Sequence, residues 1–300
     1  MISRMTAKRI LKRTAGVAST WLHPFVGRPD RPSVCILAYH RVSDIGFVDP
    51  RLDNWNVTPA MFEKQIASLA RFAEIIPVPE IPSRLGIAPA AKPSKPLVSL
   101  TFDDGFANFV TEALPVLRRY RAPATFSVVT KYVGSQEPMP FDRWSRQNRH
   151  RVPSSAWRAA TWNEIEQCVG SGLVTISSHS HEHRIGSECT AEELRAEAES
   201  SRELLRSRLG RDLPLYYAYP YGSSRPALVP AEYVVAVKRA GYQLALSTDL
   251  GLAEAHSDPF FLPRVEAFGF DSAAVLRAKA DGVLGPYIVP DWFRSAQRGA

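Results

Sequence analysis

The 300-residue sequence has no apolar run that approaches the ~18–20 residues needed for a membrane-spanning helix. It also lacks the composition of a disordered or fibrous chain, because 45% of its residues are hydrophobic and only 22% are charged. These absences predict a globular protein whose length allows one large domain or two small ones.

Cysteine is scarce as well. The three cysteines, Cys35, Cys168 and Cys189, are far apart, and the sequence has no Cys-x-x-Cys pair. This usage argues against a disulfide framework or a cysteine zinc site and fits a reducing compartment. The start of the chain is basic like a secretory signal, but residues 15–26 are broken by polar residues and Pro24, so they form no apolar core. We therefore expect an unprocessed, cytoplasmic protein.

Positive charge is concentrated at the start of the chain. The formal net charge is +7, and residues 1–31 hold seven Lys or Arg against the single acid Asp30, which gives +6. The other 269 residues carry 30 basic and 29 acidic side chains, a balance of +1. The body of the protein is nearly neutral, and it lacks a known nucleic-acid-binding module or interleaved surface aromatics. We expect no nucleic-acid partner.

Residues 1–31 are predicted to form a basic amphipathic arm, and residues 32–300 a separate catalytic domain. Within residues 9–22, apolar side chains recur at helical spacing on one face, and basic ones lie on the other. The apolar set is Ile10, Leu11, Val17, Ala18, Trp21 and Leu22. Two interpretations stay open. The arm packs on the domain or stays disordered, or residues 1–30 lie on an anionic membrane surface as a peripheral helix.

From residue 33 onward, short apolar runs alternate with longer helical patterns. Strands are predicted at 34–39, 97–102, 124–129, 173–177, 215–219 and 242–247. Helices are predicted at 59–71, 108–120, 162–170, 191–209, 228–240 and 271–281. The alternation indicates an α/β fold with a mainly parallel sheet, and about seven strands favour a barrel over an open sheet. Two long loops, 78–96 and 134–160, are of a length that is usually functional or mobile.

Two adjacent aspartates, Asp103 and Asp104, follow the predicted strand at 97–102 and precede Gly105. Catalytic side chains in α/β folds gather at the carboxyl ends of strands. Neighbouring carboxylates repel in a confined site unless a cation neutralises them, so a metal beside one would leave the other free as a general base. The alternative is an Asp-Asp-Gly turn that caps a helix.

Histidines cluster after the predicted strand at 173–177. Three of the seven, His179, His181 and His183, fall within five residues. A spacing of four places His179 and His183 on the same side of one helical turn, and neutral imidazole is a preferred zinc ligand. Two histidines and a carboxylate form a recurrent catalytic zinc set with a position open for water. We expect a divalent cation, Zn²⁺ first, although Co, Ni and Mn can share such sites.

A third strand end, residues 217–222, combines tyrosines with Pro220 and Gly222. Tyr219 and Tyr221 suit a rigid rim that stacks on a sugar ring, or they merely fill one end of a barrel.

These motifs, taken in order, resemble a known family. Thr101-Phe102-Asp103-Asp104-Gly105, then His179-Ser180-x-x-His183, then Pro220-Tyr221-Gly222 is similar to the polysaccharide deacetylases of carbohydrate esterase family four, with the homology domain of the nodulation-factor deacetylase. The similarity covers about residues 33–282. Further similar stretches begin at Leu37, Leu114, Ala122, Thr161 and Leu262.

The resemblance implies a distorted, incomplete (β/α) barrel and metal-dependent removal of an acetyl group, most often N-acetyl, from an acetylated amino-sugar glycan or its precursor. Carried over by position, Asp104, His179 and His183 bind the metal, and Asp103 is the general base. The backbone N–H of Tyr221 stabilises the tetrahedral oxyanion. Tyr219, Tyr221 and Arg264 are the predicted substrate contacts.

The chain departs from the family in two places. Many members have Arg two residues before the Pro of Pro-Tyr-Gly to orient the base, whereas this chain has Ala218, so another group must orient Asp103. The late Leu-x-His that supplies a general acid is replaced by Leu262-Pro263-Arg264. Some exopolysaccharide deacetylases resemble a permuted arrangement in which an N-terminal Tyr-His supplies this acid, and Tyr39-His40 matches it.

We therefore predict His40 as the general acid, against the alternative of a structural core histidine. His256 is a weaker candidate for the acid. Arg264 could stabilise or orient a charged group, and Asp249 could orient the base or belong to a plain turn. Two other functions stay open: a metal-dependent amidohydrolase acting on a non-sugar C–N bond, and a non-catalytic carbohydrate-binding relative.

Overall fold

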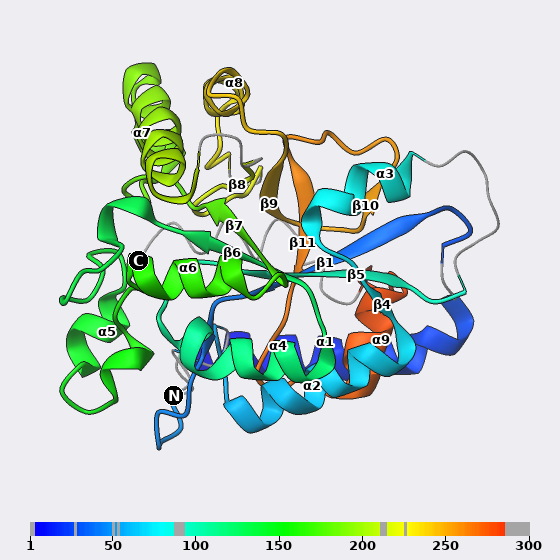
Figure 1. The fold of residues 1–300 in the computed structure, drawn as a ribbon. Coiled ribbons are helices and arrows are strands. Elements are labelled where there is room, and N and C mark those ends of the chain that lie inside the picture. Colours follow the sequence, from blue (N-terminus) through cyan, green and yellow to red (C-terminus); the bar gives the residue numbers. More distant parts are fainter. Residues whose placement is uncertain are drawn as a thin grey trace.

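Seven parallel strands close into a ring (Figure 1). The computed structural model describes residues 4–26, 29–49, 52, 55–86, 94–210, 215–224 and 227–285. Around the ring the strands are β1 (Ser33–Tyr39), β5 (Leu97–Phe102), β6 (Ala124–Val128), β7 (Val174–Ser178), β8 (Tyr217–Ala218), β9 (Ala245–Leu250) and β11 (Leu262–Glu266). Because a full (β/α) barrel has eight strands, this ring is the incomplete barrel that the sequence predicts.

Short strands extend the ring. β4 (Glu74–Ile75) pairs with β5, β10 (Ala253–Glu254) pairs antiparallel with β1, and β2 (Arg41–Val42) pairs with β3 (Asn56–Val57). Six ring strands lie within a few residues of the predicted ranges. β11 was not predicted as a strand, because Pro263 and Arg264 interrupt its apolar run.

Helices cover the outside of the ring, and several begin where the sequence predicts. They are α1 (Arg4–Val26), α2 (Pro59–Phe72), α3 (Ile81–Leu85), α4 (Leu114–Tyr120), α5 (Arg143–Asn148), α6 (Trp162–Gly170), α7 (Ala191–Leu209), α8 (Ala231–Arg239) and α9 (Ala273–Ala280). Capping boxes that begin with Thr161 and Thr190 open α6 and α7, and both helices begin at the predicted residues. The helix predicted at 108–120 instead starts with a π-helical turn, Phe109–Ala113, and continues as α4.

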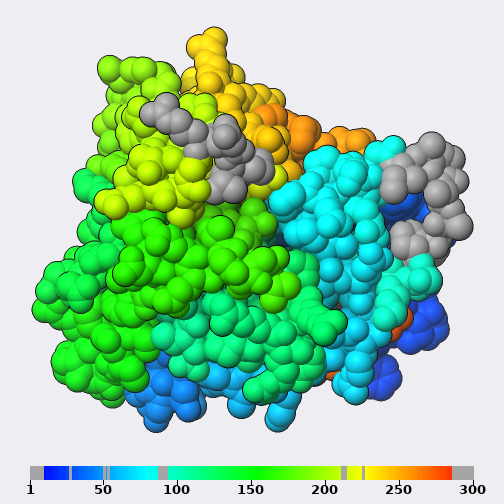
Figure 2. Space-filling view, in the orientation of Figure 1, coloured from blue at the N-terminus to red at the C-terminus, as the bar shows by residue number. Residues whose placement is uncertain are grey.

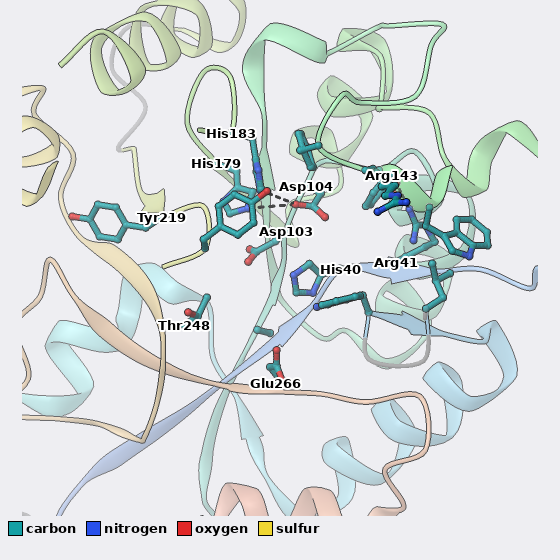
Figure 3. A pocket seen from close by; sticks show the side chains of 18 of the residues that line it. His40, Arg41, Asp103, Asp104, Arg143, His179, His183, Tyr219, Thr248 and Glu266 are labelled. Atoms are coloured by element: carbon teal, nitrogen blue, oxygen red, sulfur yellow. Dashed lines mark hydrogen bonds and ion pairs between the residues drawn. The ribbon is translucent and has the colours of Figure 1, made fainter. Parts of the chain in front are cut away.

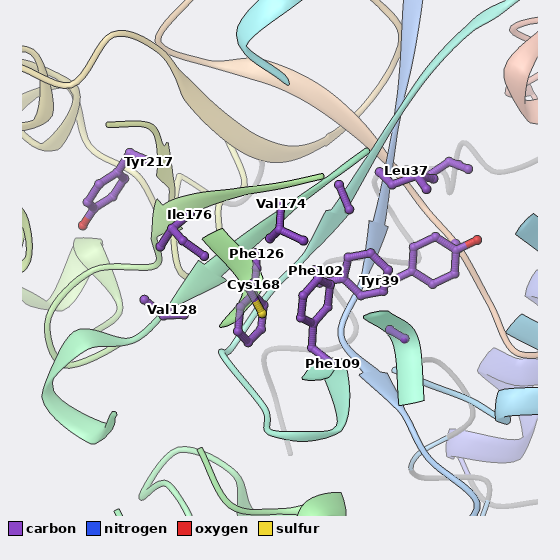
Figure 4. Packing of buried hydrophobic residues seen from close by; sticks show 14 of the residues in the cluster. Leu37, Tyr39, Phe102, Phe109, Phe126, Val128, Cys168, Val174, Ile176 and Tyr217 are labelled. Carbon is purple, nitrogen blue, oxygen red and sulfur yellow. The ribbon is translucent and has the colours of Figure 1, made fainter. Parts of the chain in front are cut away.

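In most strands of the ring, namely β1, β5, β8, β9 and β11, alternate side chains pack into two separate cores. In β5, Val98, Leu100 and Phe102 pack outward against the helices, whereas Leu97 belongs to a smaller core within the ring. The outer core contains a run of aromatic contacts (Figure 4). Phe102 stacks on Tyr39 with ring centroids 5.2 Å apart and meets Phe109, which in turn stacks on Phe126 at 4.2 Å.

This alternation brings polar side chains together at the mouth of the ring. Tyr39 of β1 pairs with Phe102 of β5, so the next residues, His40 and Asp103, lie side by side and belong to the inward-facing set. The Asp103 N–H donates to the Tyr39 carbonyl at 2.9 Å. Arg264 of β11 shares the inward parity of Leu262, which lies in the inner core.

The first helix, α1, packs against α9. His23 contacts Asp281 at 2.7 Å, and Lys12 donates to Glu266. Figure 2 shows mainly residues of α2 and α3 in cyan and residues of β6 to α7 in green, with α1 in dark blue only at the edge of this face. None of the helices that the structure describes combines the length and apolarity needed to cross a bilayer.

Candidate active site

Asp104, His179 and His183 converge at the mouth of the ring (Figure 3). The Asp104 Oδ1 lies 3.5 Å from the His179 Nε2 and 3.4 Å from the His183 Nε2. One ligand atom from each of the three residues lies within 4.8 Å of the others. The predicted metal ligands are therefore close enough to share one cation.

A tight turn at Asp104 and Gly105 points the side chains of the two adjacent aspartates in different directions. Asp104 and Gly105 both have left-handed backbone conformations, with φ of 71° and 76°. A Cβ on Gly105 would meet the Val128 Cα at 3.1 Å, so this position has little room for a side chain. The turn sends the Asp104 carboxylate toward the histidines, whereas Asp103 stays in the inward-facing row of β5.

The two predicted histidine ligands converge through a loop, so the predicted helical turn between them is wrong. Ser180 and His183 have left-handed φ values of 65° and 64°. The Ser180 hydroxyl accepts from the His183 N–H at 2.8 Å, and Glu197 of α7 accepts from the Glu182 N–H at 2.9 Å. His181 turns away and contacts the Thr130 hydroxyl at 3.0 Å. Local side-chain hydrogen bonds therefore replace helical ones.

The chemistry of these donors fits a divalent metal ion. The His179 Nδ1 donates to the Ala218 carbonyl at 2.8 Å, which leaves the Nε2 lone pair facing Asp104. The buried His183 Nδ1 has no hydrogen-bond partner in the described part of the chain, and its Nε2 also faces Asp104. Burial lowers the His183 pKa, whereas the nearby aspartates outweigh burial and raise the His179 pKa. Both imidazoles must be neutral to bind a metal.

Arg264 forms an ion pair with Asp103, the aspartate that is not a predicted metal ligand. Although burial opposes its ionisation, the Asp103 pKa is lowered to about 2, chiefly by the charge of the Arg264 guanidinium. The Arg264 Nη1 and Nη2 donate to the two Asp103 oxygens at 2.9 and 2.7 Å, and its Nε donates to the Ser247 carbonyl. Arg264 therefore orients Asp103. It supplies the contact that many family members obtain from an arginine at the position of Ala218. A substrate contact by the almost fully buried Arg264 stays a prediction.

His40 lines the same cavity as the four acidic and histidine side chains. Figure 3 shows its ring near Asp103, with Tyr219 on the other side of that aspartate in this view. This half-buried placement is not that of a core histidine. His256 is 78% exposed and stands beside Glu254, and Asp249 accepts from the Ser224 N–H at 2.9 Å. His40 is thus the candidate acid that the fold brings to the site, and its role stays a prediction.

The two predicted rim tyrosines differ in placement. Tyr221 is 41% exposed, and its ring meets His183 edge-on at 4.9 Å. Its left-handed φ is 54°, and its N–H has no hydrogen-bond partner among the described residues, as an oxyanion donor requires. The Tyr219 side chain is buried, and its hydroxyl donates to the Phe260 carbonyl. Tyr219 lines the cavity, but Figure 3 shows its hydroxyl pointing away from the aspartates and histidines, so its contact with a sugar stays a prediction.

The cavity has a volume of about 770 Å³, and one wall comes from residues that the sequence analysis did not assign to the site. This wall includes Trp55, Phe141, Arg143 and Trp144. Arg41 fastens it to the barrel by donating to the Asp142 carboxylate and the Ala156 carbonyl, both at 2.6 Å. The aromatic and basic residues of the long loop at 134–160 were the available signal for this wall.

A barrel with two histidines and a carboxylate at its mouth, next to a separate ion-paired carboxylate, belongs to the class of metal-dependent hydrolases. The model of the polysaccharide deacetylase family matches residues 90–245, just over half of the chain. The chain belongs to the polysaccharide deacetylase family, which is metal-dependent.

Curated relatives carry the name poly-beta-1,6-N-acetyl-D-glucosamine N-deacetylase. One from Staphylococcus aureus (strain MSSA476) is 24% identical over 250 residues, 78% of this chain and 78% of its own. One from Escherichia coli (strain K12) is 26% identical over 210 residues, 60% of this chain. The match spans only 29% of that longer relative.

Solved structures share the fold. The Streptococcus pyogenes deacetylase PplD, in complex with acetate, has a TM-score of 0.64 at 21% identity and covers 82% of this chain and 97% of its own. IcaB from Ammonifex degensii has a TM-score of 0.62 at 22% identity and covers 83% and 97%.

Proposed function

We propose that this protein is a metal-dependent N-deacetylase of an amino-sugar glycan. One observation carries the proposal: a metal-competent Asp104–His179–His183 set and an ionised Asp103 held by Arg264 share one cavity with His40. A metal site beside a separate carboxylate base can hydrolyse an amide, because the metal polarises the carbonyl and the base takes the proton of water.

A bound divalent ion would supply Lewis acidity, which polarises the acetyl carbonyl and makes water more acidic. Side chains and a backbone N–H of the protein carry out the proton transfers and stabilise the developing charge. A carboxylate oxygen of Asp103 accepts the proton of the attacking water, and the Tyr221 N–H stabilises the tetrahedral oxyanion. His40 donates a proton to the leaving amine nitrogen. The products are acetate and a free amino sugar.

Among divalent ions we propose Zn²⁺. Two imidazole nitrogens and one carboxylate oxygen match the three protein ligands of many catalytic zinc sites, and a fourth position stays open. Metal analysis of protein purified without added metal tests this choice.

The names of the curated relatives support β-1,6-linked N-acetylglucosamine oligomers as the first substrate to test. We expect the purified protein to release acetate from these oligomers and a chelator to stop the release. Acetate release that persists in chelator and in Asp104→Ala would refute the proposed mechanism. Release from a non-sugar acetamide alone would place the enzyme among the amidohydrolases.

We also propose that the enzyme acts in the cytoplasm, as a peripheral protein at the inner membrane face. The cysteines are free thiols, which suits a reducing compartment, and the basic segment 1–31 suits an anionic membrane. Cell fractionation with a compartment-specific labelling reagent tests this setting.

A further inference from the structure

The helix α1 turns its apolar side away from the protein. It carries seven of the thirteen large hydrophobic side chains that are exposed in the described part of the chain. Trp21 is 75% exposed and Phe25 is 87% exposed. The other five are Ile10, Leu11, Val17, Leu22 and Val26. No other described element exposes so much apolar surface.

The opposite side of α1 is small and polar, and it holds the helix to the barrel. Ala15, Gly16 and Ser19 are buried there. On the same stripe, at 100° per residue, Lys12 donates to Glu266, and its ammonium group lies 4.2 Å from the centre of the Phe268 ring. A surface helix normally packs its apolar stripe on the core, so the orientation of α1 is the reverse of the usual one.

The charge around this helix identifies the kind of surface that the apolar stripe fits. Arg13 is exposed beside the stripe, and residues 1–31 carry +6 of the net +7. Apolar and aromatic side chains flanked by basic ones are typical of helices that lie in the surface of an anionic bilayer. A purely apolar partner groove would not explain the concentration of charge.

We infer that α1 is a membrane-docking helix that inserts Ile10, Val17, Trp21 and Phe25 into the surface of an anionic lipid bilayer. Lys12, Ser19 and His23 keep the opposite stripe of the helix attached to the barrel. The helix therefore serves both as part of the folded protein and as its membrane contact.

The two ends of this attachment set the orientation of the pocket. Lys12 contacts Glu266, which lines the active-site cavity, whereas His23 contacts Asp281, just after α9. Because α9 runs back from the mouth end of β11, α1 lies along the barrel from its mouth toward its other end. Docking through α1 lays the barrel axis along the bilayer, so the mouth of the cavity faces along the membrane surface rather than away from it. On the proposed deacetylase function, this orientation suits an acetylated glycan held at the membrane, such as a lipid-linked one.

Co-sedimentation with vesicles tests the docking. The probes are vesicles of phosphatidylcholine with or without phosphatidylglycerol, and the variants are Trp21→Ser/Phe25→Ser and, as a matched control, Val235→Ser on α8, where Val235 is 44% exposed. We expect wild type and Val235→Ser to bind the anionic vesicles. Losing two inserted aromatic side chains should weaken this binding about 100-fold. Added salt and neutral vesicles should also weaken it.

Equal binding by the double variant, or no binding by wild type, would overturn the docking inference. So would a wild-type dimer that the double variant dissociates, because the apolar stripe would then join two copies. Circular dichroism checks that the variants are folded.

A second readout separates this inference from the enzymatic proposal. We expect Trp21→Ser/Phe25→Ser to release acetate from a soluble oligomer as fast as wild type but to lose activity on an N-acetylglucosaminyl lipid in anionic vesicles. Equal activity of this variant and wild type on the vesicle-held lipid would overturn the orientation inference. Absence of acetate release from either substrate by wild type would refute the deacetylase proposal, whereas vesicle binding would still report on docking.

Discussion

The ion pair between Asp103 and Arg264 sets the ionisation of the proposed base. Both side chains are almost fully buried, so each would be costly to bury without the other. Because the folded-state pKa of Asp103 is below its ordinary value, the pair stabilises the fold above the unfolded pKa, and this contribution is lost as the pH falls toward about 2.

Replacing Arg264 by Lys keeps the charge but removes the two-pronged contact with Asp103. We expect kcat/KM to fall about 10- to 100-fold. The acid limb of its pH profile should move to higher pH, because a less well-paired Asp103 takes up a proton more readily. Arg195→Lys on the exposed face of α7 is the control. An unchanged acid limb in a folded Arg264→Lys protein would contradict the assignment of Asp103 as the base.

The histidine cluster supplies its own control for metal binding. His183→Ala removes a proposed ligand, whereas His181→Ala removes a neighbour that faces Thr130. Because loss of even an outer hydrogen-bonding partner weakens metal sites about 10- to 100-fold, we expect His183→Ala to weaken Zn²⁺ binding by more than about 100-fold. Equilibrium dialysis should show near wild-type binding by His181→Ala. Similar losses in both variants would point to a structural loop rather than a metal site.

His40 is predicted to act on the leaving amine without holding the metal. His40→Gln should lower kcat about 100- to 10,000-fold at unchanged metal content, the usual range for loss of a general acid. His256→Gln, at an exposed position away from the cavity, should leave kcat unchanged. Near wild-type kcat in His40→Gln would remove His40 from the mechanism.

At the scale of elements, the loop after β8 depends on one close backbone approach. A Cβ on Gly222 would lie 2.9 Å from both the Thr248 nitrogen and the Tyr219 carbonyl oxygen. We expect Gly222→Ala to shift the loop and with it the Tyr221 N–H, lowering kcat about 10- to 100-fold while the metal stays bound. Gly170→Ala in α6, where a Cβ meets nothing within 4 Å, is the control. Equal kcat in the two variants would show that Tyr221 is not a donor in the reaction.

The elements also show what the sequence could predict. The capping boxes of α6 and α7 depend on residues three apart, so the local pattern was sufficient to place both helix starts. Strand β11 was missed because its place in the ring depends on pairing with β1 and β9, which no local pattern reports. The cavity wall around Trp144 was missed for the same reason, since Arg41 fastens it from more than 100 residues away.

At the scale of the whole molecule, closure of the ring explains why residues distant in sequence share one site. His40, Asp103, His179 and Arg264 come from four strands or the loops that follow them, and parallel strands place all of these ends at one mouth. The short motifs Asp103-Asp104 and His179–His183 were enough to predict the metal ligands, and the fold brings these ligands together. The contact between Arg264 and Asp103 spans 161 residues and required the fold.

The proposed reaction depends most on a metal held by Asp104, His179 and His183. The most direct test is to strip the protein of metal, add Zn²⁺ in steps, and measure acetate release from an N-acetylglucosamine oligomer against bound metal. We expect no release without metal and a linear rise that ends at one ion per chain, with no rise in Asp104→Ala. Full acetate release by metal-free protein would contradict the account.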